Sequence, residues 1–570
     1  MRTFIETHSV ETRLPKTWRC LPPSAVALLV LAVFVPALAA GFVGWDDDDL
    51  LLNEARYRTL SWDNLAWMFT TSYTGHFQPL TWLSYWFDVR LWSLDPFGFH
   101  FANVALHMGC AVTFFFIVRR LVIEARTGLT ARQVQWGATL ATVLFATHPL
   151  RVESVAWIAE RRDVLSAFFF LLSIACYLRY AGAGQCDGQS PRASKATWYV
   201  AMLLCCAVSL LAKATAVMLP LVLWVLDVYP LRRFGEARSK SNSLVWTDKL
   251  PLLAMSVVAG VRAVLAQREQ GAMVPFAEHD FPSRVIQAGY GLIFYLWKSV
   301  APMNLGPLYE LPSRDVLIQG YAWSWLGVVA LAVTAIAVRR SLPAVTAAIA
   351  VYVVMLAPVL GLAQSGPQLV ADRYSYLACT GFAIIAGVAA VRGGAWLAAR
   401  RRSNLRAAYV LSAAVVLTLL QHATLKQCDV WRSALALWSH GVRVSPNSAI
   451  AHANYADALA ATGDLRGATA HYARSLDLRP GDPITTHHLA DVLRASGDVD
   501  RAISMYVRTL QLDSTRSEAH FSLARLLIDQ GRGEQAALVM RERLRRVPDD
   551  RRAAAFLAEV NGPTTNEPGN

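Results

Sequence analysis

The sequence predicts an all-α protein in which a multispanning membrane domain is followed by a solenoid of helical repeats. Of the 570 residues, 55% are hydrophobic and 17% are charged, and the mean hydropathy is +0.34. This composition is too apolar for a soluble protein of that length. The last part of the chain is less apolar and carries a period of 34 residues, which is typical of repeats built from helix pairs.

Apolar segments close to the length of about 20 residues that a helix needs to cross a bilayer recur along the first three quarters of the chain. They lie at 24–43, 101–118, 136–150, 164–180, 198–212, 216–231, 250–266, 286–303, 321–338, 343–361, 374–391 and 407–425. The most basic connecting segments hold 23 Lys or Arg against 6 Asp or Glu, which predicts that they are cytoplasmic. All of these basic segments lie on the cytoplasmic side of the membrane only if one of the twelve apolar segments, 286–303, does not cross it. We therefore expect about 11 transmembrane helices.

This pattern gives a domain map. Residues 1–23 form a cytoplasmic N-terminus, 24–426 the membrane domain with a first outer loop at 44–100, and 427–570 an outer C-terminal part. The outer loop holds eight acids against three arginines. A cleaved signal peptide is an alternative for 24–43, since small residues at Ala37 and Ala39 follow its apolar core.

The C-terminal part contains tetratricopeptide repeats at 449–482, 483–516 and 517–550. The phased positions are Gly463, Gly497 and Gly531, then Ala456, Ala490 and Ala524, then Ala468, Ala502 and Ala536. A half repeat at 427–448 precedes them, a capping helix at 551–560 follows, and 561–570 is predicted to be a disordered tail. Such arrays bind peptides or partner proteins, and they also serve as rigid spacers.

Four consecutive acids, Asp46 to Asp49, follow the first apolar segment directly. Adjacent carboxylates raise one another's pKa by repulsion. Such a run is expected where the carboxylates contact a cation, a phosphate-bound metal or a substrate that donates a proton. The run therefore indicates the catalytic end of a membrane enzyme. A solvated acidic loop is the plain alternative.

Histidines add further candidates on the predicted outer side. His76 lies in the turn before an aromatic stretch of the first outer loop, and His100 and His107 are seven residues apart, on one face of the next helix. Two intramembrane histidines in phase favour a site, although a single one usually satisfies a neighbouring group.

A second charged cluster runs from His148 to Asp163 and includes Glu153, Arg161 and Arg162. Arginine suits phosphate at a membrane boundary because its charge is permanent and its donors are bidentate. The two arginines can aim at a different surface from the carboxylates. The alternative is an internal salt-bridge network that locks the helix. Arg373, in the segment 371–377, supplies another cation at a predicted outer boundary.

Several long motifs, in order, resemble the transmembrane and tetratricopeptide-repeat O-mannosyltransferases, of which this chain looks like a bacterial relative. They are WDDDDLLLN, GHFQPLTWLSYWFD, PFGFHFANVALH, ATHPLRVESVAWIAERRDVLSAFFFLL, GPLYELP and ADRYSYLACTGF. The resemblance implies a C-type glycosyltransferase fold with its active site in the first outer loop, an inverting transfer, a polyprenyl-phosphate sugar donor and a protein acceptor. It also implies a multi-pass protein of the bacterial inner membrane, with the repeats on the outer, periplasmic face.

Inverting transfer needs a carboxylate base and cations that balance the leaving phosphate. We assign Asp47 as base and Asp46 to orient the acceptor or a divalent ion. The donor-phosphate candidates are His148, Arg161, Arg162 and Arg373; the supporting residues are Asp48, Asp49, His76, His100, His107, Glu153 and Asp163. This mechanism requires no cofactor, and it is compatible with a divalent cation bound by Asp46 and Asp47. The repeats would hold the acceptor or a partner; a nucleic-acid partner is not expected.

Two other classes stay open. A non-catalytic membrane-anchored repeat scaffold predicts that Asp46 and Asp47 are dispensable while the repeat surface is not. A transporter predicts that Lys213, Asp227 and Lys298 matter more than the acids of the outer loop.

Overall fold

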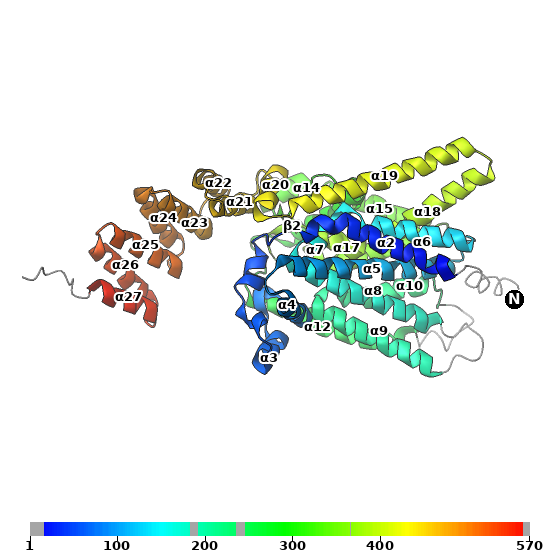
Figure 1. Ribbon diagram of the computed structural model, residues 1–570, viewed down its shortest axis with the longest axis horizontal. Coiled ribbons are helices and arrows are strands. Elements are labelled where there is room, and N and C mark those ends of the chain that lie inside the picture. Colours follow the sequence, from blue (N-terminus) through cyan, green and yellow to red (C-terminus); the bar gives the residue numbers. More distant parts are fainter. Residues whose placement is uncertain (1–15, 183–191, 235–244, 365, 562–570) are drawn as a thin grey trace, which may run out of the picture. The chain divides into compact units, whose positions relative to one another are not determined.

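The computed structural model describes residues 16–182, 192–234, 245–364 and 366–561. The predicted N-terminal segment 1–23 and tail 561–570 therefore lie largely outside the described residues. The chain divides into two compact units, Met1–Ser433 and Ala434–Asn570, and both are built from helices (Figure 1). The first unit ends seven residues after the predicted boundary at 426, because its last helix continues to Val430.

The first unit consists of long helices joined by short helical turns. The helices are α2 (Lys16–Leu38), α3 (Trp62–Thr70), α4 (Pro79–Trp92), α5 (Pro96–Glu124), α6 (Ala131–Ala146), α7 (Val152–Ala156), α8 (Arg161–Gly182), α9 (Arg192–Ala212), α10 (Leu219–Val228), α12 (Leu250–Glu269), α13 (Phe281–Val300), α14 (Arg314–Tyr321), α15 (Ser324–Val338), α16 (Pro343–Leu356), α17 (Ser375–Ala378), α18 (Thr380–Ala399) and α19 (Ser403–Val430). Two short antiparallel strands, β1 (Tyr309–Glu310) and β2 (Gln368–Val370), pair with Tyr309 opposite Val370.

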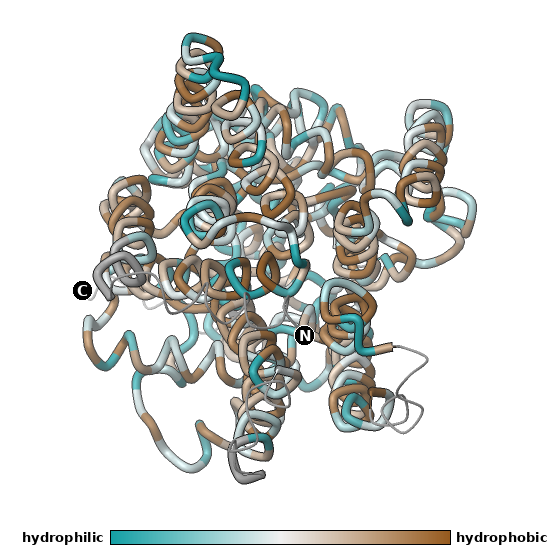
Figure 2. Tube along the Cα trace, turned by 90° about the vertical axis from the view of Figure 1, so that its right-hand side faces the viewer, coloured by the Kyte–Doolittle hydropathy of each residue, from teal (hydrophilic) through white to brown (hydrophobic). Residues whose placement is uncertain are grey.

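Six helices among the described residues are long and apolar enough to cross a membrane, or seven if α14 and α15, which are bent by 52°, form one span. The chain is thus a multi-pass membrane protein, and Figure 2 shows hydrophobic residues, in brown, recurring along its helices. Three further apolar helices, at Pro22–Leu38, Ala214–Val228 and Pro343–Val359, are shorter. The predicted number of 11 is not confirmed. Helix α13, which covers residues 286–300 of the excluded segment 286–303, is not among the six.

Close packing of α6 against α18 depends on a glycine. A Cβ atom at Gly387 would lie 2.5 Å from the backbone nitrogen of Ala141 and 2.7 Å from the carbonyl oxygen of Gly137. Only a residue without a side chain lets the two backbones approach this closely. Helix α5 packs against α6 and α8 in the same bundle, and the bundle carries the connecting segments described below at one of its ends.

The second unit has the helix pairs that the 34-residue period predicts. They are α21 (Ala449–Ala461) with α22 (Leu465–Leu478), α23 (Pro483–Ala495) with α24 (Val499–Leu512), and α25 (Ser517–Asp529) with α26 (Gly533–Arg546); α20 (Ala434–Val444) precedes them and α27 (Arg551–Asn561) follows. The phased glycines at the turns have φ between 72° and 87°, a conformation that favours glycine. All six phased alanines are fully buried.

Candidate active site

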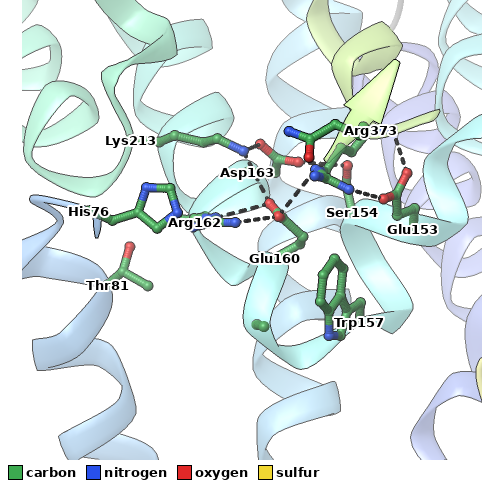
Figure 3. A network of polar contacts seen from close by, with 12 residues as sticks. His76, Thr81, Glu153, Ser154, Trp157, Glu160, Arg162, Asp163, Lys213 and Arg373 are labelled. Atoms are coloured by element: carbon green, nitrogen blue, oxygen red, sulfur yellow. Dashed lines mark hydrogen bonds and ion pairs between the residues drawn. The ribbon is translucent and has the colours of Figure 1, made fainter. Parts of the chain in front are cut away.

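Segments that are far apart in the sequence meet at one end of the helical bundle of the first unit. They are the acidic run after α2, the segment from α7 into α8, the turn after α9 and the turn before α17. Figure 3 shows the polar network that the last three of these segments form, with His76 beside it. The sequence predicts three of these segments, all but the turn after α9, at outer boundaries, and the structure brings all four together.

Asp47 is the most buried acid of the run, with no exposed surface. Its Oδ2 accepts the backbone N–H of Val43 at 3.1 Å, and its Oδ1 accepts that of Ala159 at 3.0 Å. Burial raises the pKa of Asp47 to about 7, and the two N–H donors oppose that rise. The carboxyl group therefore ties the acidic run to the segment before α8, and both of its oxygens are occupied in doing so.

Asp46 is partly exposed, and it faces the charged network. Burial raises its pKa, Arg162 and Arg373 lower it, and Glu160 raises it. A raised pKa suits a general base that works near neutral pH. Asp48 and Asp49 are exposed, beyond the network. Asp47 is thus enclosed, whereas Asp46 is partly exposed beside the charges of Arg162 and Arg373, and the roles assigned to the two acids stay predictions.

Glu160 is the centre of the network. Its fully buried carboxylate accepts from Arg162 through Nε at 3.1 Å and Nη2 at 2.5 Å. It also pairs with Lys213 Nζ at 3.1 Å and with Arg373 Nε at 3.2 Å. Three cations on three different segments thus share one carboxylate, which fixes their mutual positions (Figure 3).

Two more carboxylates complete the network. Glu153 accepts the backbone N–H of Arg373 at 2.8 Å and pairs with its guanidinium group. Asp163 pairs with Lys213 at 2.6 Å and accepts the Ser154 hydroxyl at 3.0 Å. The network therefore balances three cations with three acids. The expectation that the arginines face away from the carboxylates is wrong for Arg162.

A stack of indole rings supports the acidic run. Trp45 packs on Trp157 with the ring centroids 4.7 Å apart and the planes 15° apart. Trp157 packs in turn on Trp431, at 5.5 Å, and the Arg373 guanidinium lies 5.7 Å from the centroid of the Trp157 ring. The stack therefore joins Trp45, next to Asp46, to Trp157, three residues before Glu160.

His76 lies beside Arg162, at the same end of the network as Lys213 (Figure 3). Burial and the charges of Arg162 and Lys213 hold the pKa of His76 well below its usual value, so the ring stays neutral. Its Nδ1 lies 3.4 Å from Nε2 of Gln267. If Gln267 donates, Nε2 of His76 carries the ring proton and can donate to an anion.

Besides the exposed Asp48 and Asp49, four predicted site residues lie outside this network. Arg161 pairs with Asp88 and donates to Asn103 Oδ1 and the Phe99 carbonyl, both at 2.8 Å, so its guanidinium group is held between α4 and α5. His148 contacts the Ser299 carbonyl at 3.2 Å. His100 and His107 share the buried face of α5, as predicted, and His107 contacts Tyr376 and the Ala146 carbonyl. These side chains stabilise the bundle.

Sequence reasoning did not select Glu160 or Lys213 for the site. Lys213 lies between two apolar segments with only Ala212, Ala214 and Thr215 around it. A lone lysine at such a break lies close to the outer boundary, and that position was the available signal. Among the residues described here, no group of three or more His, Cys, Asp or Glu is arranged to hold a metal ion. Because both oxygens of Asp47 accept backbone N–H groups, that carboxylate is poorly placed as a metal ligand.

The fold and the charged site define a class: a multi-pass membrane protein with a polar site at one end of its bundle and tetratricopeptide repeats at its C-terminus. Family models described as tetratricopeptide repeat match residues 429–483 and 493–560. This match confirms the prediction made from the period of 34 residues.

The chain is a relative of the protein O-mannosyl-transferases. It is 24% identical over 438 residues to human Protein O-mannosyl-transferase TMTC1, covering 70% of this chain and 48% of that protein. It is 25% identical over 502 residues to human TMTC4, covering 79% of this chain and 66% of that protein. The chain spans about half the length of TMTC1 and of Drosophila melanogaster Tmtc3.

A solved structure, ArnT from Cupriavidus metallidurans bound to undecaprenyl phosphate, is similar to 77% of this chain. The match covers 80% of ArnT with 16% identity and a TM-score of 0.35.

Proposed function

We propose that this chain is a glycosyltransferase that moves a mannose-like sugar from a polyprenyl-phosphate donor to a hydroxyl group of a protein on the outer face of the membrane. The position of Asp46 beside the cations gathered on Glu160 carries the proposal. It places a candidate base next to candidate phosphate ligands at one end of an apolar bundle. The names of the relatives support the reaction class.

The transfer follows from these positions. Asp46 removes the proton of the acceptor hydroxyl, whose oxygen attacks the anomeric carbon as the bond to the donor phosphate breaks, with inversion. Arg162 uses Nε and Nη2 on Glu160, and Arg373 uses Nε and Nη1 on Glu160 and Glu153. The Nη1 atom of Arg162 and the Nη2 atom of Arg373 lie outside these contacts and can donate to the phosphate. Neutral His76 supplies a further N–H.

The proposal also assigns roles to Asp47 and to the repeats, and a location to the site. Asp47, hydrogen-bonded to Val43 and Ala159, positions Asp46 without touching the acceptor. The repeats bind the acceptor polypeptide or a partner protein. The proposed location is the bacterial inner membrane, with the N-terminus in the cytoplasm and the site outside. A divalent cation is not required, since arginine side chains can balance the leaving phosphate.

The test is transfer of radiolabelled mannose from polyprenyl-phosphate mannose to protein, in membranes that contain the wild-type chain or a variant. Asp46→Asn should lower the rate by about 10²–10⁴-fold, the range for loss of a general base. Asp49→Asn, an exposed acid in the same run, is the matched control and should keep the wild-type rate. Equal rates for the two variants would overturn the assignment of the base.

The non-catalytic scaffold remains the second candidate, and the full pairing of Arg162, Lys213 and Arg373 favours it. A network whose charges already balance is sufficient to lock the helices and needs no ligand. The scaffold predicts no labelled protein from any sugar donor. It also predicts a cellular phenotype that survives Asp46→Asn and is lost when Gln427 to Asn570 are deleted.

A further inference from the structure

An apolar cavity of about 390 Å³ lies inside the helical bundle, among α5, α8, α10, α16 and α18. Its volume falls within the roughly 300–1,000 Å³ of small-molecule sites. Along α18 it is lined from Thr380 to Arg392, which is about 18 Å at about 1.5 Å per residue. That length is close to one leaflet of the roughly 30 Å hydrocarbon core. The cavity has the length and chemistry of a hydrocarbon chain.

Aromatic side chains pack against the cavity lining at the end nearer the charged network. Phe114 lines the cavity there, and its ring lies 4.8 Å from that of Phe145. Phe145 packs on Tyr376, at 5.5 Å, and the Arg151 guanidinium lies 5.7 and 5.4 Å from these two ring centroids. Phe145, Tyr376 and Arg151 are buried. Phe114 is thus backed by packed side chains toward Tyr376, which is three residues after Arg373 in the sequence, and this favours the opposite end of the cavity for a headgroup.

The opposite end of the cavity is basic. Arg392 lines it, is exposed to solvent, and donates through Nη2 to the Thr127 carbonyl at 2.7 Å. Tyr229 also lines this end, and the charges of both Arg232 and Arg392 act on it. Arg232 is exposed as well. One exposed arginine therefore lines this end of the apolar cavity, and a second, Arg232, follows the lining residue Pro230 by two positions.

We infer that this cavity is a binding site for an anionic phospholipid, which places one acyl chain between the helices and its phosphate headgroup at Arg232 and Arg392. Basic pockets between transmembrane helices attract anionic headgroups. The lipid comes from the leaflet at this end, the cytoplasmic one in the orientation that the charge distribution predicts. The site is distinct from the proposed donor site, and it does not depend on sugar transfer.

The experiment is native mass spectrometry of the delipidated full chain in detergent, titrated with dioleoyl phosphatidylglycerol or with dioleoyl phosphatidylcholine. Phosphatidylglycerol should bind more tightly. Arg232→Gln with Arg392→Gln should weaken it about 30-fold, which is about fivefold for each arginine. Arg340→Gln, an exposed arginine at the same end outside the cavity lining, is the matched control and should bind like the wild type.

A second variant tests the cavity itself. Ala344→Phe fills the lining near the basic end without changing any charge, and it should displace the acyl chain and weaken phosphatidylglycerol binding. The inference is overturned if the two lipids bind equally, or if either variant binds phosphatidylglycerol as the wild type does. It is also overturned if polyprenyl phosphate competes for the same site, because the cavity would then belong to the donor.

Discussion

Asp47 gives the sharpest test of how the acidic run is held. Its carboxyl group is fully buried, and its pKa is raised to about 7 from the ordinary 3.8. The folded segment therefore binds the proton more tightly than the opened segment does. Its stability is highest below about pH 4 and falls as the pH rises through 7. Asp47→Asn removes the titration and should remove this dependence.

The magnitude follows from the shift. Between pH 5 and pH 7 the folded segment keeps a proton that the opened segment has lost, and each pH unit is worth about 1.36 kcal/mol. The segment around Asp47 should thus lose about 2.7 kcal/mol over this interval, roughly a 100-fold change in its opening equilibrium. Asparagine leaves one of the two N–H groups without an acceptor, which costs about 1–3 kcal/mol at every pH.

Hydrogen exchange of residues 43–53, followed by mass spectrometry and corrected for the intrinsic pH dependence of exchange, measures this opening. Wild-type protection should fall about 100-fold between pH 5 and pH 8, whereas protection in Asp47→Asn should be lower at pH 5 and nearly independent of pH. Asp49→Asn, at an exposed position, should follow the wild type. The same pH slope in wild type and Asp47→Asn would refute the reasoning.

Three further outcomes are expected. Glu160→Gln should destabilise the protein by about 3–5 kcal/mol in thermal unfolding, since three cations lose their shared charge; an unchanged melting temperature would contradict the central role of Glu160. Arg162→Gln should raise the donor KM in the transfer assay, whereas Arg161→Gln, which faces Asp88, should lower stability and leave the KM unchanged; equal effects on the KM would remove the distinction. Gly387→Ala should destabilise the chain by about 1–3 kcal/mol, because its Cβ meets the α6 backbone; Gly394→Ala, where a Cβ has open space, is the control, and similar losses in both would show that the contact is not tight.

The sequence was sufficient to predict three of the segments that meet at the site, but not the turn that carries Lys213. Charge bias placed the acidic run, the segment 148–163 and Arg373 at outer boundaries, and the structure gathers them at one end of the bundle. The regular repeats were predictable because each helix pair repeats the same local packing. The single glycine in the turn between paired helices and the buried alanines fix that packing in every unit.

The roles of single side chains were not predictable in this way. Arg161 and Arg162 are neighbours at the start of α8, where successive side chains point in different directions around the helix axis. One therefore reaches Asp88 and the other Glu160. Likewise, the enclosure of Asp47 depends on the backbone N–H of Ala159, which lies 112 residues away in the sequence. Tertiary contacts of this kind leave no local signature.

The transporter hypothesis can be judged from where its three charged residues lie. Lys213 belongs to the network around Glu160. Asp227 pairs with Lys249 at 2.5 Å, and Arg233 and Tyr177 also contact it. Lys298 donates to the carbonyl of Met303, at the end of α13.

Each of these three charged residues thus has its partners in a different part of the bundle, and the cavity among α5, α8, α10, α16 and α18 has a mainly apolar lining. A path for a charged solute would need polar groups in succession along the bundle. The arrangement instead separates a charged site at one end of the bundle from a mainly apolar cavity, and this favours the proposed transfer reaction over a transport path.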